Sequence, residues 1–161
     1  MDLNPDLPTG DEKAEKVQGM FDRIAPRYDF VNRIMTFRLD VRWRKQTVQA
    51  LELEKDSLVI DLACGTGDFC CELENAGMVP LGFDFSMGML QAGRSASPLC
   101  QSDVLRLPIR DASVDGATCG FALRNLTELE PFFAEVNRVL KVGGRIGSVS
   151  YTHLRAHETR T

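Results

Sequence analysis

Residues 58–76 constrain the fold more than any other part of the chain. An apolar run of strand length, residues 58–63, stops at the turn Gly65-Thr66-Gly67, and apolar residues then recur at helical spacing from Phe69. A buried strand, a glycine turn and the start of a helix form the nucleotide cradle of an α/β sheet. Because the two glycines have no side chains, the backbone can bend sharply there and let a ligand come close.

Two common phosphate-binding motifs do not fit this turn. A phosphate loop has a Lys after its glycines, and a dinucleotide fingerprint has Gly or Ala where this chain has Cys70. Acids flank the turn instead, at Asp61 and Asp68, and they suit a ligand that is not purely anionic. S-adenosylmethionine carries an ammonium and a sulfonium and no phosphate. The string Asp-Leu-Ala-Cys-Gly-Thr-Gly-Asp at residues 61–68 resembles the first motif of class I S-adenosylmethionine-dependent methyltransferases.

Strand and helix patterns alternate along the rest of the chain. We expect strands over residues 58–63, 78–84, 99–103, 114–121 and 145–149, and helices over 11–24, 40–53, 69–76, 87–96 and 127–140. Ser86 and Thr127 are the expected N-caps of the last two helices, and Glu130 completes a capping box with Thr127. The fold class is therefore α/β, a doubly wound and mostly parallel sheet with helices ahead of its first strand.

Ligands of such sheets bind at the carboxyl ends of the strands. Asp84 ends the second expected strand, where an acid can accept hydrogen bonds from ribose hydroxyls. Asp103 ends the third and can meet an adenine amino group, with Val104 against the ring. The predicted cofactor-binding residues are Asp61, Gly65, Thr66, Gly67, Asp84, Phe85, Asp103, Val104 and Gly120.

Composition excludes several other classes of protein. A chain of 161 residues suits one domain, and its net charge of −4 gives no reason to expect nucleic acid as a partner. No apolar run reaches the ~20 residues of a membrane span and residues 1–10 are no signal peptide, so we expect a cytoplasmic protein. Residues 1–152 contain no histidine, and no metal site is expected. The five cysteines lie in or beside apolar segments, and we expect reduced, buried thiols.

The two ends of the chain differ from its middle. Residues 1–10 contain two prolines and a glycine and are expected to be disordered. Residues 149–161 are polar, lack strand alternation and resemble a translated sequencing-library adapter, so we expect a non-native tail and a native sequence that continues beyond Ser148. For this reason the i, i+4 pair His153 and His157 is discounted as a metal site. The expected methyltransferase domain is residues 11–148.

Several further segments together resemble the ubiquinone/menaquinone biosynthesis C-methyltransferases. They are Met-Phe-Asp-Arg-Ile-Ala-Pro-Arg-Tyr-Asp at 20–29 with Asn32, Trp-Arg-Lys at 43–45, Gly-Phe-Ala-Leu-Arg-Asn-Leu at 120–126 and Arg-Val-Leu-Lys-Val-Gly-Gly-Arg at 138–145. The resemblance covers residues 17–148. Thr66 matches the family's glycine-loop contact to the cofactor, and Gly120 stands where some members have a serine. The family's sheet has a sixth and a seventh strand, for which this chain has no matching segment.

The resemblance implies transfer of a methyl group from S-adenosylmethionine to a ring carbon of a polyprenylated quinol, a demethylmenaquinol or a ubiquinone precursor. It also implies transient association with the membrane surface. Arg124 is expected to stabilise a substrate phenolate, Asn125 to fix a ring oxygen and Tyr28 to join them over the substrate. Two alternatives stay open: a methyltransferase of the same fold that acts on another small molecule, and a non-catalytic module that binds S-adenosylmethionine.

Overall fold

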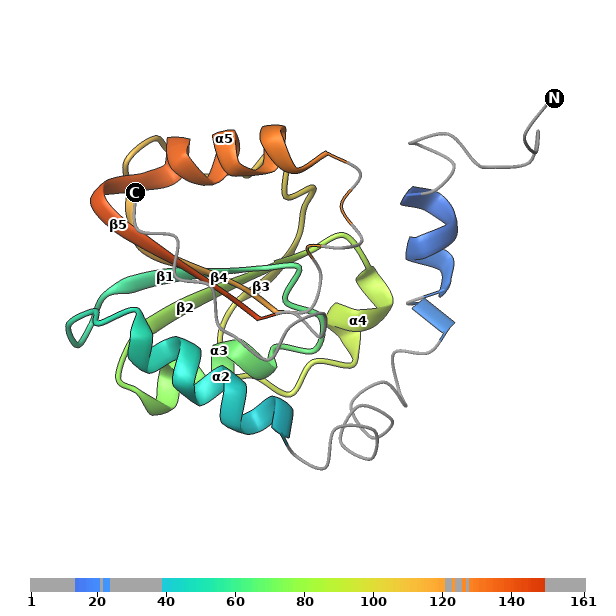
Figure 1. Ribbon diagram of the computed structural model, residues 1–161. Coiled ribbons are helices and arrows are strands. Elements are labelled where there is room, and N and C mark those ends of the chain that lie inside the picture. Colours follow the sequence, from blue (N-terminus) through green and yellow to red (C-terminus); the bar gives the residue numbers. More distant parts are fainter. Residues whose placement is uncertain are drawn as a thin grey trace, which may run out of the picture.

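A computed structural model describes residues 14–20, 22–23, 39–120, 123, 126 and 128–149. Its strands are β1 (Leu58–Leu62), β2 (Val79–Asp84), β3 (Leu99–Gln101), β4 (Val114–Gly120) and β5 (Leu140–Val149). Its labelled helices are α2 (Leu39–Ala50), α3 (Asp68–Asn75), α4 (Met87–Gln91) and α5 (Leu129–Val139). Residues 14–20 and 22–23 are also helical and lie beside α4 (Figure 1).

The five strands form one parallel sheet in the order β3-β2-β1-β4-β5. The chain builds outward from β1 to β3 on one side, then returns to the centre and builds outward through β4 and β5. This arrangement is the expected doubly wound sheet. The strand order reverses between β1 and β4, and the carboxyl ends of these strands are where such sheets bind ligands.

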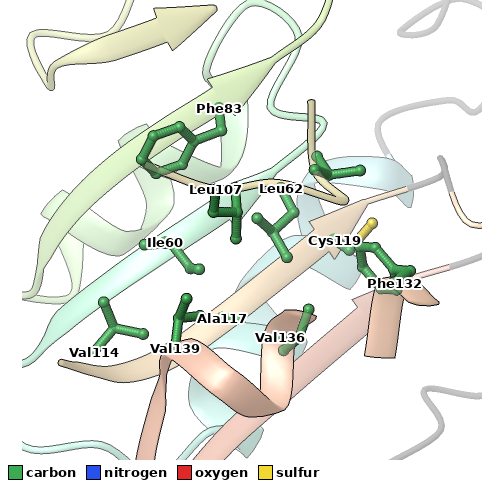
Figure 2. Packing of buried hydrophobic residues seen from close by; sticks show 11 residues of the cluster. Ile60, Leu62, Phe83, Leu107, Val114, Ala117, Cys119, Phe132, Val136 and Val139 are labelled. Atoms are coloured by element: carbon green, nitrogen blue, oxygen red, sulfur yellow. The ribbon is translucent and has the colours of Figure 1, made fainter. Parts of the chain in front are cut away.

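Helices cover both faces of the sheet, α5 on one and α2 with α3 on the other (Figure 1). The α5 face holds the larger apolar cluster, shown in Figure 2, in which Ile60 and Leu62 meet Phe132 and Val136. Val59 lies on the opposite face and belongs to a second cluster with helices α2 and α3. Burial on both faces explains why β1 reads as a continuous apolar run and not as an alternating one.

Several element boundaries differ from the expectation. Helix α2 ends at Ala50 and not at Leu53, and strand β3 ends at Gln101, so Asp103 lies in the loop after the strand and does not end it. Helix α4 begins at the expected N-cap, with the Ser86 hydroxyl accepting the Met89 N–H at 3.2 Å, but ends at Gln91 and not near residue 96. The Arg94 N–H donates to the Thr66 carbonyl at 3.2 Å and so leaves the helical ladder. Helix α5 has Glu128 at its N-cap, with no side-chain capping bond; Thr127 lies outside the described residues.

Strand β5 starts five residues earlier than expected. Leu140 already pairs with Val114, and pairing resumes with Arg145 opposite Gly116, so the expected Gly143-Gly144 turn is an irregularity inside the strand. Gly143 has a φ of 81°, a left-handed conformation that glycine adopts at little cost.

The prediction that the cysteines are reduced is correct, but the prediction that they are buried is wrong for Cys100. All five cysteines are free, and Cys64, Cys70 and Cys119 are buried. Cys71 is half-buried, and Cys100 is exposed because it lies on the short strand β3 at one edge of the sheet. None of the helices in the described ranges has the length and apolar character needed to cross a bilayer.

Candidate cofactor site

The glycine turn after β1 is shaped by its backbone. Gly65 and Gly67 have φ values of 57° and 91°, which residues with side chains rarely adopt. A Cβ atom on Gly67 would lie 2.8 Å from the Cβ of Ser95, so there is no room for a side chain either. The Cys64 N–H donates to the Phe83 carbonyl at 2.9 Å and holds the turn against the end of β2.

Asp84 joins this turn to the loop that follows β2. Its Oδ2 accepts the Gly65 N–H and its Oδ1 accepts the Ser86 N–H, both at 2.8 Å. Burial raises the pKa of this carboxyl above its ordinary value, while backbone N–H bonds from Ser86, Gly65 and Phe85 act in the opposite direction. A carboxylate has about four acceptor positions, so Asp84 retains capacity for a ribose hydroxyl.

Asp61 lies beneath the turn and not on its surface. The side chain is 1% exposed, and its Oδ1 accepts a hydrogen bond from the Thr118 hydroxyl of β4 at 2.7 Å. Burial raises the pKa of Asp61 to about 8, and the nearby charge of Asp84 adds to the rise. The contact with Thr118 was not anticipated from the sequence, because the two residues are 57 positions apart.

The other described residues of the predicted site lie around the same edge of the sheet in different environments. Thr66 is buried, Phe85 is 44% exposed directly after β2, and Val104 packs into the α5-face cluster. Asp103 is exposed, and its Oδ1 accepts the Leu105 N–H at 2.9 Å.

Gly120 ends β4 against an aromatic ring. A Cβ atom at this position would lie 2.5 Å from Cε2 of Phe69. The serine that some family members carry here would require the Phe69 ring to move. Glycine at this position therefore leaves room for Phe69, the second residue of α3.

Hydrogen bonds join the N-terminal helical segment, residues 14–20 and 22–23, to the loop that follows Asp84. Oδ1 of Asp22 accepts the Gly88 N–H at 2.9 Å and the Ser86 hydroxyl, and the Gln18 side-chain amide donates to the Phe85 carbonyl at 3.1 Å. A Cβ atom on Gly88 would lie 2.8 Å from the Cα of Asp22, so the two backbones are in close contact. We expected helices ahead of β1, but no local pattern predicts these particular bonds.

Arg44 of α2 also lies beside the glycine turn, where the sequence did not lead us to expect it. The side chain is buried and lies between Asp40 and Asp68, at the amino end of α3. A buried arginine beside a glycine turn was visible in the sequence only as part of the Trp-Arg-Lys family segment. The predicted catalytic residues Arg124, Asn125 and Tyr28 lie outside the described residues.

Solved structures of other proteins share this fold. A chain of the complex between the Haloferax volcanii Trm112 methyltransferase activator and a methyltransferase superposes with a TM-score of 0.67 at 26% identity, over 80% of this chain and 58% of that one. The PH0226 protein from Pyrococcus horikoshii has a TM-score of 0.59 at 30% identity, over 67% of this chain and 57% of its own. The fold is thus that of Rossmann-like class I methyltransferases.

Curated relatives are more similar in sequence. The demethylmenaquinone methyltransferase of Corynebacterium kroppenstedtii is 41% identical over 139 residues, which are 86% of this chain and 61% of the relative. The enzyme of the same name from Desulfitobacterium hafniense is 42% identical over 154 residues, 88% of this chain and 60% of the relative. The chain therefore spans about three fifths of the length of these relatives. Residues 9–160 match the model of the ubiE/COQ5 methyltransferase family, and this chain belongs to that family.

Proposed function

We propose that the protein transfers a methyl group from S-adenosylmethionine to a ring carbon of a polyprenylated quinol, with demethylmenaquinol as the first candidate. Family membership and relatives named demethylmenaquinone methyltransferase support the acceptor. Asp84 is the main support for S-adenosylmethionine as the methyl donor. Its carboxylate accepts the Gly65 N–H of the glycine turn and can accept a further hydrogen bond at the carboxyl edge of the sheet.

The residues of this edge fit an adenosyl ligand with a zwitterionic amino-acid part. Asp84 would accept a ribose hydroxyl, and Phe85, Asp103 and Val104 would border the adenine. The turn from Gly65 to Gly67 would face the amino-acid part with its backbone. When bound, S-adenosylmethionine supplies a methyl group on a sulfonium, which is already an activated leaving group, so the protein has chiefly to align the reactants and exclude water.

The acceptor carbon needs activation by the protein. A phenol has an ordinary pKa near ~10, and its ring carbon becomes a better nucleophile once the proton is lost. Arg124 is the proposed partner of the phenolate, because a guanidinium lowers the pKa of an adjacent acid and donates hydrogen bonds to its oxygen. Asn125 would fix the ring oxygen and Tyr28 would close over the ring. A polyprenyl tail is confined to membranes, so we further propose transient contact with the membrane surface.

Two variants of the full-length gene product test this assignment. With S-adenosylmethionine and demethylmenaquinol, Arg124→Ala should lower turnover by roughly 10²-fold or more and leave cofactor affinity within about twofold, since its partner is the developing phenolate. Arg106→Ala changes an exposed arginine on the same edge of the sheet and serves as the control. If S-adenosylhomocysteine is released only with other phenols, the protein is a methyltransferase that acts on a different substrate. If S-adenosylmethionine binds without any turnover, the protein is a non-catalytic binding module.

A further inference from the structure

Arg44 occupies a buried position next to the glycine turn. Its exposed fraction is 7%, and its Nη1 donates to Oδ2 of Asp40 at 3.1 Å, one helical turn away on α2. Its Nη2 lies 3.8 Å from Oδ2 of Asp68, the first residue of α3. The guanidinium therefore lies where α2 meets the amino end of α3.

One edge of this guanidinium carries an unused donor. The Nε atom is buried and has no hydrogen-bond partner within the part of the chain that the structure describes. In a planar guanidinium the Nε–H and an Nη2–H point to the same side and form a fork that matches a carboxylate. At 3.8 Å the Asp68 carboxylate forms an ion pair with Nη2 but is too far for a hydrogen bond. Buried donors are nearly always satisfied, so this one indicates a missing acceptor.

The amino end of α3 supplies more donors at the same place. The first N–H groups of a helix have no partners within the helix, and the helix dipole makes this end favourable for an anion. The N-cap residue of α3 is Gly67, which has no side chain that could accept those N–H groups. The Arg44 fork and the end of α3 thus offer donors to one small anionic group.

The charges around Arg44 indicate which kind of anionic group could bind there. Arg44 is flanked by Asp40 and Asp68, and it is close enough to Asp61 to lower the pKa of that carboxyl. The two carboxylates that pair with this arginine disfavour a phosphate, whose charge has no compensation there. They suit a group that carries a carboxylate and an ammonium together, as an α-amino acid does.

We propose that Arg44 binds the α-carboxylate of the cofactor's amino-acid moiety through its Nε and Nη2 edge, beside the amino end of α3. This role rests on the proposed function, in which S-adenosylmethionine occupies the carboxyl edge of the sheet. Asp40 holds the guanidinium in place from the same helix, and the neighbouring acids balance the ligand's ammonium. Arg44 is thus a cofactor-binding residue that also sets the preference for an intact amino-acid group.

The test compares two ligands that differ in one group. S-adenosylmethionine and its decarboxylated form are titrated calorimetrically into the full-length gene product. The wild type should bind S-adenosylmethionine at least about tenfold more tightly. Arg44→Gln should abolish most of that preference by weakening S-adenosylmethionine alone, and Arg44→Lys should retain part of it, because Lys keeps the charge without the fork. Arg42→Gln, at an exposed arginine of the same helix, should behave as wild type.

Several outcomes would overturn the proposal. Equal affinity of the wild type for the two ligands would do so without any variant, and so would an Arg44→Gln protein that loses affinity for both ligands equally. If Arg44→Gln does not fold, as judged by circular dichroism, the wild-type comparison and Arg44→Lys still decide, since a lysine variant with full preference for the carboxylate contradicts the fork. A wild type that binds neither ligand would refute the proposed function itself, which is a different result.

Discussion

The two edges of the sheet use the same residue types in opposite ways. At the carboxyl edge, burial raises the pKa values of Asp61 and Asp84, and both side chains lie under or beside the glycine turn. At the amino edge, Asp115 accepts hydrogen bonds from the Lys141 ammonium at 2.9 Å and the Leu58 N–H at 2.8 Å, and these lower its pKa. Asp115 is thus satisfied as an anion by partners within the chain.

This difference distinguishes the amino edge, which serves stability, from the carboxyl edge, which we propose binds the cofactor. An acid with a lowered pKa is already stabilised as an anion, and a ligand has little to add. An acid with a raised pKa is held in an environment that disfavours its charge, which is common where a cation or a hydroxyl ligand completes the structure. The contrast predicts that changes at the carboxyl edge affect stability and ligand binding together, whereas changes at the amino edge affect stability alone.

Asp84→Ala should have the largest effect and Asp115→Ala is its matched control, because each removes an acid that accepts hydrogen bonds from within the chain. Loss of Asp84 leaves the part-buried Gly65 and Ser86 N–H groups without their acceptor, at a cost of about 1 kcal/mol or more each. It should also weaken S-adenosylhomocysteine binding by roughly tenfold or more. Asp115→Ala should lower the unfolding free energy without changing that affinity. Calorimetry that finds equal ligand affinities in the two variants would contradict the contrast.

Asp61→Asn should change how stability depends on pH. With a pKa raised to about 8 in the folded state and 3.8 as its ordinary value, Asp61 binds a proton more tightly when folded. Its contribution to stability is therefore complete below about pH 4 and is lost as the pH rises towards 8, at on the order of 1 kcal/mol per pH unit. An asparagine can still accept from the Thr118 hydroxyl and cannot ionise. Urea unfolding should show a flatter profile for the variant between pH 5 and pH 8; parallel profiles would argue that Asp61 is ionised in the fold.

Asp22→Ala should loosen the N-terminal helical segment with little effect on the sheet. It removes the acceptor of the Gly88 N–H and the Ser86 hydroxyl, a loss of about 1 kcal/mol for partly exposed bonds. Trypsin should then cleave faster after Lys16 and Arg23, while the melting temperature changes little. Glu15→Ala, at an exposed residue of the same segment, is the control. Unchanged cleavage rates would mean that these bonds do not hold the segment.

Lys141→Ala should have the smallest effect. The ammonium is half-exposed and pairs with Asp115, and exposed ion pairs contribute about 0–1 kcal/mol. Asp115 keeps the Leu58 N–H as a donor in this variant. Chemical denaturation should show a loss below about 1 kcal/mol, with unchanged cofactor affinity. A loss of 2 kcal/mol or more would show that the amino edge depends on this charge pair.

The sequence was most informative where local pattern decides the structure. The continuous apolar run of β1, the glycine turn and the Ser86 N-cap were all predicted, because strand burial, left-handed backbone and capping leave direct marks in neighbouring residues. The parallel direction of the strands was predicted from the alternation of strands and helices, and it placed Asp84 at the carboxyl edge of the sheet. The catalytic assignments of Arg124, Asn125 and Tyr28 stay predictions, since these residues lie outside the described part of the chain.

The features that were missed all depend on contacts between distant residues. The early end of α4 follows from the bond between Arg94 and Thr66, and the burial of Asp61 from a partner on β4. The buried fork of Arg44 exists only because α2 packs against α3. No local pattern carries such information, so an acid at a strand end can be placed at an edge of the sheet from sequence, whereas its burial, pKa and partners cannot.

Hydrogen–deuterium exchange of the full-length gene product, with and without saturating S-adenosylhomocysteine, shows which edge of the sheet binds the cofactor. We expect the ligand to slow amide exchange in residues 61–70, 84–88 and 103–105, where the glycine turn, Asp84 and Asp103 lie. We expect no change in residues 52–57 and 140–145 at the opposite edge of the sheet. Protection at the amino edge, or no protection at the glycine turn while calorimetry shows the ligand bound, would contradict the assignment of the carboxyl edge as the cofactor site.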